Sequence, residues 1–336
     1  MILVTGGTGL VGSHLLFKLV EKGHPVRAIY RLEKKIDIAK HVFSYYSNQE
    51  ENHFKKIEWI RADINDIPSL TNAFHGITHV YHCAALVSLD PKNYFKLRHI
   101  NIEGTANVVN LCLTNSIEKL CYVSSISTIG NEQGTNLISE NTHWNPEEDH
   151  NVYAITKYGA EMEVWRGARE GLNTVIVNPG IIIGPGFWHT GSGSFFKAVY
   201  KGMSYYTKGV EGYVDINDVT KPMIQLMESD IINQRYILVS ENLCYKDFFT
   251  KIAEGINVKP PTKEASKLLL SFAWRLDWLR SNLLNKSRRL TKHTAQSVLI
   301  DSVYSNEKIV KTLNYRFTPI DESISESCRL FLHDLA

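Results

Sequence analysis

Tyr153 and Lys157 are the pair of residues best suited to chemistry, because they stand four positions apart in a segment expected to be helical. In a helix that spacing brings the phenol and the ammonium onto one face. A free phenol titrates near pH 10, so acid–base work at neutral pH requires a pKa shift of about three units, roughly 4 kcal/mol. The charge of Lys157 can supply much of this shift. Taken alone, the same spacing also occurs as a plain structural pair.

Hydroxyl groups end a separate predicted strand, residues 120–125, whose last two residues are Ser124 and Ser125. Because successive side chains of a strand point to opposite faces, the two serines serve different environments. The spacing by itself leaves open which of them faces Tyr153.

The elements that must position these groups begin with a strand over residues 1–5, which runs into Gly6-Gly7-Thr8-Gly9-Leu10-Val11-Gly12 and a helical pattern. Where a strand, a glycine turn and a helix follow one another, backbone N–H groups and the helix dipole can bind a pyrophosphate. One glycine must take a positive φ, one must let phosphate approach, and one must let the helix pack on the strand. Gly6, Gly9 and Gly12 fall at those places, so the turn predicts dinucleotide binding.

Short apolar strands then alternate with helical patterns along the chain. The predicted strands are 26–30, 57–61, 79–82, 120–124 and 174–178. This alternation predicts an α/β fold, a Rossmann-type doubly wound parallel sheet with ligands at the carboxyl ends of its strands. We expect this dinucleotide-binding domain over residues 1–180. A smaller C-terminal substrate-binding lobe is expected over 181–336, with some segments returning to the first domain. Its glycine-rich stretch 191–194 is either a mobile flap or an ordinary linker.

Composition narrows the function classes. The 336 residues carry 37 Lys and Arg against 35 Asp and Glu, which gives nucleic-acid binding little support. The five cysteines are widely spaced in apolar patterns and are expected to be reduced core residues. The thirteen histidines show no metal-binding spacing, so no metal is expected. The N-terminal strand leaves no room for a secretion signal, which favours a cytoplasmic location.

The glycine turn TGxxGxxG, the serine strand and the downstream YxxxK together resemble the extended short-chain dehydrogenase/reductase family, within the NAD-dependent epimerase/dehydratase superfamily. Further family landmarks are Asp63-Ile64, Asn178-Pro179-Gly180 and the stretches 82–85, 101–105 and 213–218. The resemblance covers nearly the whole chain and is weak between about residues 260 and 300.

The resemblance implies roles for particular residues. Ser125 would hydrogen-bond the substrate oxygen, Tyr153 would act as general acid or base, and Lys157 would also hold the nicotinamide ribose. Asn101 would order a proton-relay water, although a helical asparagine can equally satisfy nearby backbone. The implied cofactor-binding positions are Gly6, Thr8, Gly9, Leu10, Val11, Gly12, Arg31, Asp63, Ile64, Ala84, Ala85, Tyr153, Lys157 and Pro179. The family also suggests a homodimer through the helix that bears Tyr153.

Cofactor choice is expected at the end of the second strand, where an acidic residue would accept hydrogen bonds from the ribose of NAD. This chain has Tyr30 and Arg31 there. A guanidinium can pair with a 2′-phosphate in two hydrogen bonds and stack on adenine, which favours NADP(H) over NAD(H). The alternative is that Arg31 is a solvated charge at a strand end.

Two departures from the family pattern narrow the reaction. Ile126-Ser127 stand where dehydratases carry an acidic pair, and Glu211 stands where epimerases carry an arginine for a substrate diphosphate. The remaining branch resembles dihydroflavonol 4-reductase, cinnamoyl-CoA reductase and 3β-hydroxysteroid dehydrogenase, which interconvert carbonyls and alcohols. We therefore expect an NADP(H)-dependent oxidoreductase acting on a small, fairly apolar substrate. Two alternatives are an NAD-dependent sugar-nucleotide epimerase and a non-catalytic NADP(H)-binding sensor or scaffold.

Two apolar segments have open roles. Four aromatic residues after the predicted strand 174–178 suit either a substrate pocket or a core: Phe187, Trp188, Phe195 and Phe196. The segment 263–292 combines leucines and tryptophans with lysines and arginines. It is either a helical cap over the substrate pocket or a surface for peripheral contact with an anionic membrane.

Overall fold

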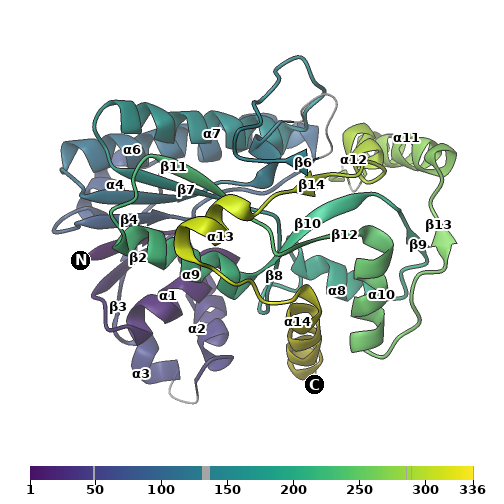
Figure 1. Ribbon diagram of the computed structural model, residues 1–336, viewed down its shortest axis with the longest axis horizontal. Coiled ribbons are helices and arrows are strands. Elements are labelled where there is room, and N and C mark those ends of the chain that lie inside the picture. The colour runs from purple at the N-terminus through teal and green to yellow at the C-terminus, as the bar shows by residue number, and fades with distance from the viewer. Residues whose placement is uncertain (48–49, 131–136, 285, 289, 336) are drawn as a thin grey trace.

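A seven-stranded parallel sheet forms the centre of the molecule (Figure 1). The computed structural model describes residues 1–47, 50–130, 137–284, 286–288 and 290–335. The strand order is β3-β2-β1-β4-β5-β7-β11, and every neighbouring pair is parallel. The strands are β1 (Ile2–Thr5), β2 (Val26–Tyr30), β3 (Ile57–Arg61), β4 (His79–His82), β5 (Lys119–Val123), β7 (Thr174–Pro179) and β11 (Gln234–Leu238). The Rossmann-type fold expected from the sequence is therefore confirmed.

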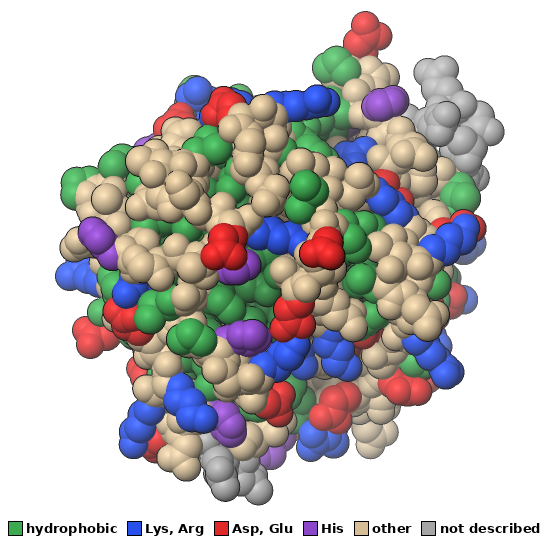
Figure 2. Space-filling model, turned by 60° about the vertical axis from the view of Figure 1, so that its left-hand side comes forward, with side chains coloured by type: hydrophobic (Ala, Val, Ile, Leu, Met, Phe, Trp, Pro, Cys, Tyr) green, Lys and Arg blue, Asp and Glu red, His purple; other side chains and the backbone are tan. Residues whose placement is uncertain are grey.

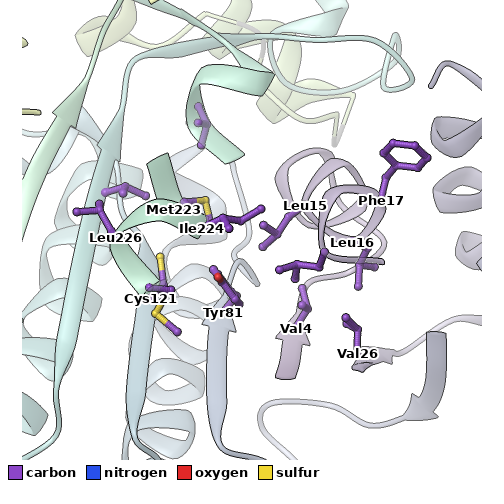
Figure 3. Packing of buried hydrophobic residues seen from close by; sticks show 14 of the residues in the cluster. Val4, Leu15, Leu16, Phe17, Val26, Tyr81, Cys121, Met223, Ile224 and Leu226 are labelled. Carbon is purple, nitrogen blue, oxygen red and sulfur yellow. The ribbon is translucent and has the colours of Figure 1, made fainter. Parts of the chain in front are cut away.

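Helices cover both faces of this sheet, because its strands are apolar on both sides. One layer contains α1 (Leu10–Glu21), α2 (Ile36–Ser44), α3 (Glu50–Phe54) and α9 (Ile216–Glu228); the other contains α4 (Ile67–Ala73), α6 (Gly104–Thr114) and α7 (Val152–Arg169). Figure 3 shows the first layer from close by, with Leu15 and Leu16 of α1 and Met223 of α9 meeting Val4 and Tyr81 of the sheet. This packing fixes where α1 starts relative to β1.

The direction of winding reverses between β1 and β4. Strand β1 pairs with β2 on one side and with β4 on the other, in the register Thr5 opposite His82. In an open parallel sheet the loops leave such a pair of strands in opposite directions, and a crevice opens at their carboxyl ends. The glycine turn follows β1 at this crevice.

A second lobe follows β7. Its three-stranded sheet contains β8 (Ile181–Ile183), β10 (Val210–Asp215) and β12 (Glu241–Cys244), in the order β12-β10-β8. Helices α8 (Gly193–Tyr200), α10 (Tyr245–Gly255) and α14 (Ile320–Leu335) enclose an aromatic core with it. Trp188 and Phe196 are buried in that core, and the Nε1–H of Trp188 donates to Asp334 at 2.7 Å. These two aromatic residues are core residues because distant segments pack on them.

Shorter elements and the C-terminal helices complete both parts of the fold. They are α5 (Tyr94–Leu97), a π-helical turn (Arg98–Glu103), α11 (Lys267–Leu283), α12 (Lys292–Ser297), α13 (Glu307–Leu313) and two short strand pairs, β6 (Leu137–Ile138) with β14 (Val303–Tyr304) and β9 (Tyr205–Tyr206) with β13 (Lys263–Glu264). The stretch considered as a flap is the start of α8, where the Ser192 hydroxyl donates to the Ile182 carbonyl at 2.5 Å.

One face of the surface is mixed in charge, and the described helices are short or polar compared with a membrane span. On the face shown in Figure 2, charged side chains of both signs are interspersed with polar and apolar ones. Among the described residues, no helix is both long and apolar enough to span a bilayer.

Candidate active site

The glycine turn has the geometry that a bound pyrophosphate needs. Gly6 has φ +69°, and a Cβ there would lie 2.6 Å from the Ala84 nitrogen. A Cβ on Gly12 would lie 2.2 Å from the Gly6 carbonyl oxygen, so helix α1 can sit on the turn only with glycine at this position. Gly9 caps α1 without a side-chain hydrogen bond, which leaves the first backbone N–H groups of the helix for an anion.

A pocket lies at the crevice between the β1 and β4 ends. Its lining contains seven of the cofactor-binding positions expected from the sequence, namely Gly6, Thr8, Gly9, Arg31, Ile64, Ala84 and Ala85. Leu10, Val11 and Gly12 belong to the first turn of α1 beside it. Asp63 lines an adjoining hollow that also contains Arg31 and Arg61. Pro179 is buried at the end of β7, paired with Leu238, and is not a lining residue of either hollow.

Tyr153 and Ser125 come together where α7 begins. Asn151 caps this helix by accepting a hydrogen bond from the Ala154 N–H at 2.8 Å, which sets Tyr153 in its first turn. Burial raises the pKa of Tyr153 to about 12, and its hydrogen bond with Ser125 offsets part of that rise. The phenol is therefore protonated at neutral pH, as a proton donor must be.

Lys157 is directed toward β5, in contrast to the expectation that it lowers the pKa of Tyr153. Its ammonium donates to the Tyr122 hydroxyl at 2.6 Å and to the Val123 carbonyl at 2.8 Å. Burial lowers the pKa of Lys157 to about 7, while the carboxylate of Glu161 acts to raise it. The pKa of Tyr153 therefore stays above its ordinary value, because burial and Ser125 set it and Lys157 is held by the strand instead.

The two adjacent serines face opposite environments. Ser124 is buried and donates to a Glu161 carboxylate oxygen at 2.5 Å. Ser125 is half-buried, accepts hydrogen bonds from the Ser127 N–H at 3.2 Å and the Ser127 hydroxyl at 2.9 Å, and also meets Tyr153. Of the two serines, Ser125 is therefore the one beside the Tyr153 phenol. The alternation of side chains along a strand predicts that the two serines differ in this way.

The sequence profile of the NAD dependent epimerase/dehydratase family matches residues 2–230, about two thirds of the chain. The chain belongs to this family. Its relatives include cinnamoyl-CoA reductase 1 of Petunia hybrida, 28% identical over 78% of this chain and 80% of that protein. They also include dihydroflavonol 4-reductase of Dianthus caryophyllus, 26% identical over 70% of this chain and 68% of that protein. The protein is therefore an extended short-chain dehydrogenase/reductase of the dihydroflavonol 4-reductase-like branch.

Solved structures share the fold of this family member. UDP-glucose 4-epimerase of Thermotoga maritima, determined with UDP-glucose, has a TM-score of 0.78 and 19% identity, and the match covers 100% of this chain and 99% of that one. At this identity the likeness establishes the fold. The uncapped start of α1 and the pocket lined from β1 to β4 fit a nicotinamide dinucleotide, the cofactor class of the family.

The side chain of Asn101 hydrogen-bonds to the backbone of a neighbouring segment. Its side chain accepts a hydrogen bond from the Leu86 N–H at 2.8 Å and donates to the Leu86 carbonyl at 3.0 Å and to Thr156 at 3.3 Å. The residue lies in the π-helical turn, a feature that frequently marks functional sites. Asn101 thus fixes the segment that follows Ala84 and Ala85 against the helix bearing Tyr153.

Sequence reasoning missed two groups of residues around the site. Glu161 is fully buried one turn beyond Lys157, and the same i, i+4 spacing that singled out Lys157 could have found it. At the adenosine end, Lys35 and Arg61 line the hollows that Arg31 also lines, and Arg31 lies 3.6 Å from the Asp63 carboxylate. Their shared location depends on the pairing of β2 with β3, which places Arg61 opposite Tyr30.

Proposed function

We propose that this protein is an NADP(H)-dependent oxidoreductase that interconverts a carbonyl and an alcohol on a small, fairly apolar substrate. The observation that carries the proposal is the contact between Tyr153 and Ser125 at the carboxyl end of β5, where Lys157 binds the Val123 carbonyl of the same strand. The dinucleotide pocket opens at the same edge of the sheet. The names of the reductase relatives support the same reaction class.

A dinucleotide held by the glycine turn and the uncapped start of α1 would supply the hydride for reduction or accept it in oxidation. In the direction of reduction, the Tyr153 hydroxyl transfers its proton to the carbonyl oxygen as the carbonyl carbon becomes tetrahedral. The Ser125 hydroxyl donates a hydrogen bond to the same oxygen and holds it beside the phenol. When protonated, Lys157 places a positive charge next to the end of β5, and its ammonium group can donate hydrogen bonds to ribose hydroxyls. For oxidation the roles reverse, with the Tyr153 phenolate accepting the proton of the alcohol.

The basic side chains at the adenosine end support NADP(H) as the cofactor. Arg31, Lys35 and Arg61 are exposed around the two adjoining hollows, and Tyr30 occupies the place of the acidic residue that would favour NAD(H). A 2′-phosphate there would replace Asp63 as the anionic partner of Arg31 and gain charge-assisted hydrogen bonds.

Glu211 supports a substrate without a diphosphate. It lies in β10, and burial raises the pKa of its carboxyl group to about 7 while it accepts the Gly212 N–H at 3.1 Å. A carboxyl group here offers a nucleotide diphosphate no positive charge, whereas sugar-nucleotide epimerases of the family resemble one another in carrying an arginine at this place. The epimerase function is the second candidate, because the matched family includes epimerases.

The test is NADPH oxidation with a panel of aldehydes and ketones, using wild-type protein and Tyr153→Phe. The change removes only the proton donor, so turnover should fall by at least 10²-fold, the lower range for general acid catalysis, with NADPH binding kept. Tyr158→Phe, on the same helix and stacked on Trp144, is the matched control and should stay active. An active Tyr153→Phe enzyme would refute the mechanism. Tightly retained NAD would favour an epimerase, and NADPH binding without any turnover would favour a sensor.

A further inference from the structure

Helix α11 presents a continuous apolar stripe to solvent. With 100° between successive residues of an α-helix, six apolar residues fall side by side on one face with no polar residue between them. They are Leu268, Leu269, Phe272, Leu276, Leu279 and Leu283, and each is 40–74% exposed. In a helix that packs its apolar face on the protein, these apolar side chains would be buried and the polar ones exposed.

The opposite face of α11 attaches the helix to the molecule. Ser281 is the one residue of α11 that is buried, and the ammonium of Lys92 donates to its hydroxyl at 3.2 Å and to its carbonyl at 3.3 Å. Just beyond the helix, the Arg288 N–H donates to Asp90 at 2.9 Å. The apolar stripe therefore points away from the body, which argues against the interpretation of this helix as a lining of the pocket. In Figure 1, α11 lies at the periphery of the molecule, far from β3.

Basic residues border the stripe on both sides. Arg275 follows Leu268 around the helix, with its guanidinium 4.5 Å from the Trp274 ring centroid, and Arg280 follows Leu269 and pairs with Asp277 at 2.7 Å. The segment 263–292 contains eight lysines and arginines against two acidic residues, whereas the remainder of the chain has 29 against 33. The positive charge of the protein is thus concentrated around its exposed apolar helix.

We propose that α11 is the docking surface of this protein for an anionic lipid bilayer. Leucine and phenylalanine side chains at this spacing enter the boundary between headgroups and acyl chains, while the flanking arginines remain at the level of the phosphates. A second copy of the chain is a poorer occupant, because a two-fold interface would bring the same positive segment against itself. Lipid headgroups provide the opposite charge over the whole segment.

Docking through α11 would also orient the candidate active site. The residues that hold α11, Asp90 and Lys92, belong to the segment that leads from Ala85 through Leu86, which Asn101 fixes. The bilayer would then lie on the side of the molecule where this segment is exposed. This orientation, unlike the docking itself, has functional meaning only if the proposed reductase function holds.

The test is co-sedimentation of the full chain with vesicles of phosphatidylcholine, with and without phosphatidylglycerol. Wild-type protein should bind the anionic vesicles at least tenfold more tightly than the neutral ones. Phe272→Glu combined with Leu276→Glu should lose at least tenfold in binding, while Ile232→Glu, at an exposed apolar residue elsewhere, should bind as wild type. Arg275→Gln and Lys286→Gln should each weaken binding to anionic vesicles about fivefold, the equivalent of about 1 kcal/mol per basic residue.

The outcomes separate the alternatives. Unchanged melting temperatures and unchanged stabilisation by NADPH would show that the variants fold, and would keep this test independent of the proposed reaction. Absence of wild-type binding to anionic vesicles, or equal binding by Phe272→Glu/Leu276→Glu, would overturn the proposal. A wild-type dimer that this double variant converts to a monomer, with no vesicle binding by either, would overturn it in favour of an interface between copies.

Discussion

Glu161 should control both the stability of the site and the ionisation of Lys157. One of its carboxylate oxygens accepts three buried hydrogen bonds, from Ser124 at 2.5 Å, Thr128 at 2.8 Å and Asn178 at 2.9 Å. The other accepts from Trp165 at 3.3 Å and pairs with Arg235 at 3.3 Å. The side chain therefore ties α7 to the end of β5 and to strands β7 and β11.

Replacing Glu161 with alanine would leave these donors and the Arg235 charge without their acceptor. Breaking a buried pair of this kind costs about 3–5 kcal/mol. With an unfolding entropy of about 2.1 cal/mol/K per residue, that cost lowers the melting temperature by about 4–7 °C for a chain of this length. Glu161→Gln keeps the size and one acceptor oxygen, so its cost should be about 1–3 kcal/mol.

The charge of Glu161 can be tested separately from its packing. Its carboxylate raises the pKa of Lys157, so Glu161→Gln should move the loss of the Lys157 charge to lower pH. The assay is the pH profile of kcat/KM for reduction of a carbonyl that the wild type accepts, together with thermal denaturation. Glu163→Gln is the matched control, because Glu163 lies on the same helix and pairs with Arg166 near the surface. An unchanged pH profile in Glu161→Gln, or equal destabilisation by Glu163→Gln, would refute this reasoning.

Two further predictions concern the turn and the pH dependence. Gly12→Ala should abolish dinucleotide binding in a titration and lower the melting temperature, because the new Cβ would stand 2.2 Å from the Gly6 carbonyl oxygen; an alanine variant that binds like wild type would contradict the assigned geometry. In wild-type protein, Lys157 is charged below its pKa of about 7 and loses its proton above it, so kcat/KM for reduction should be constant on the acid side and fall above pH 7. A reduction profile that rises between pH 7 and 9 would show that the Lys157 cation is not required.

The sheet could be predicted because its signals are local. Strands β2, β3 and β4 begin and end at the expected residues, since short apolar runs between turn signals fix them. The alternation of strands with helices predicts that the sheet is parallel. The glycine turn could also be predicted, because only glycine suits the positive φ of Gly6 and the close contact between Gly12 and the Gly6 carbonyl. The family follows from three such local motifs taken together, namely the glycine turn, the serine strand and the spacing of Tyr153 and Lys157.

Features built from distant segments could not be predicted. The residues around Lys157 in the sequence do not predict that it donates hydrogen bonds to Tyr122 and the Val123 carbonyl. That contact depends on how α7 packs on β5. Trp188 suits a substrate pocket as well as a core until α14 supplies Asp334 as its hydrogen-bond partner. The direction of the α11 stripe has the same origin, since the 90–92 segment decides which face of that helix is buried.

The most direct test of the central claim is the melting shift of the purified protein with NADPH and with NADH, alongside an assay for nucleotide retained through purification. At a ligand concentration about 100 times Kd, binding contributes about 2.7 kcal/mol, which raises the melting temperature of a chain of this length by about 4 °C. The account predicts this shift with exchangeable NADPH, a clearly smaller one with NADH, and loss of the difference in Arg31→Gln. Equal shifts, or NAD that stays bound through purification, would contradict it.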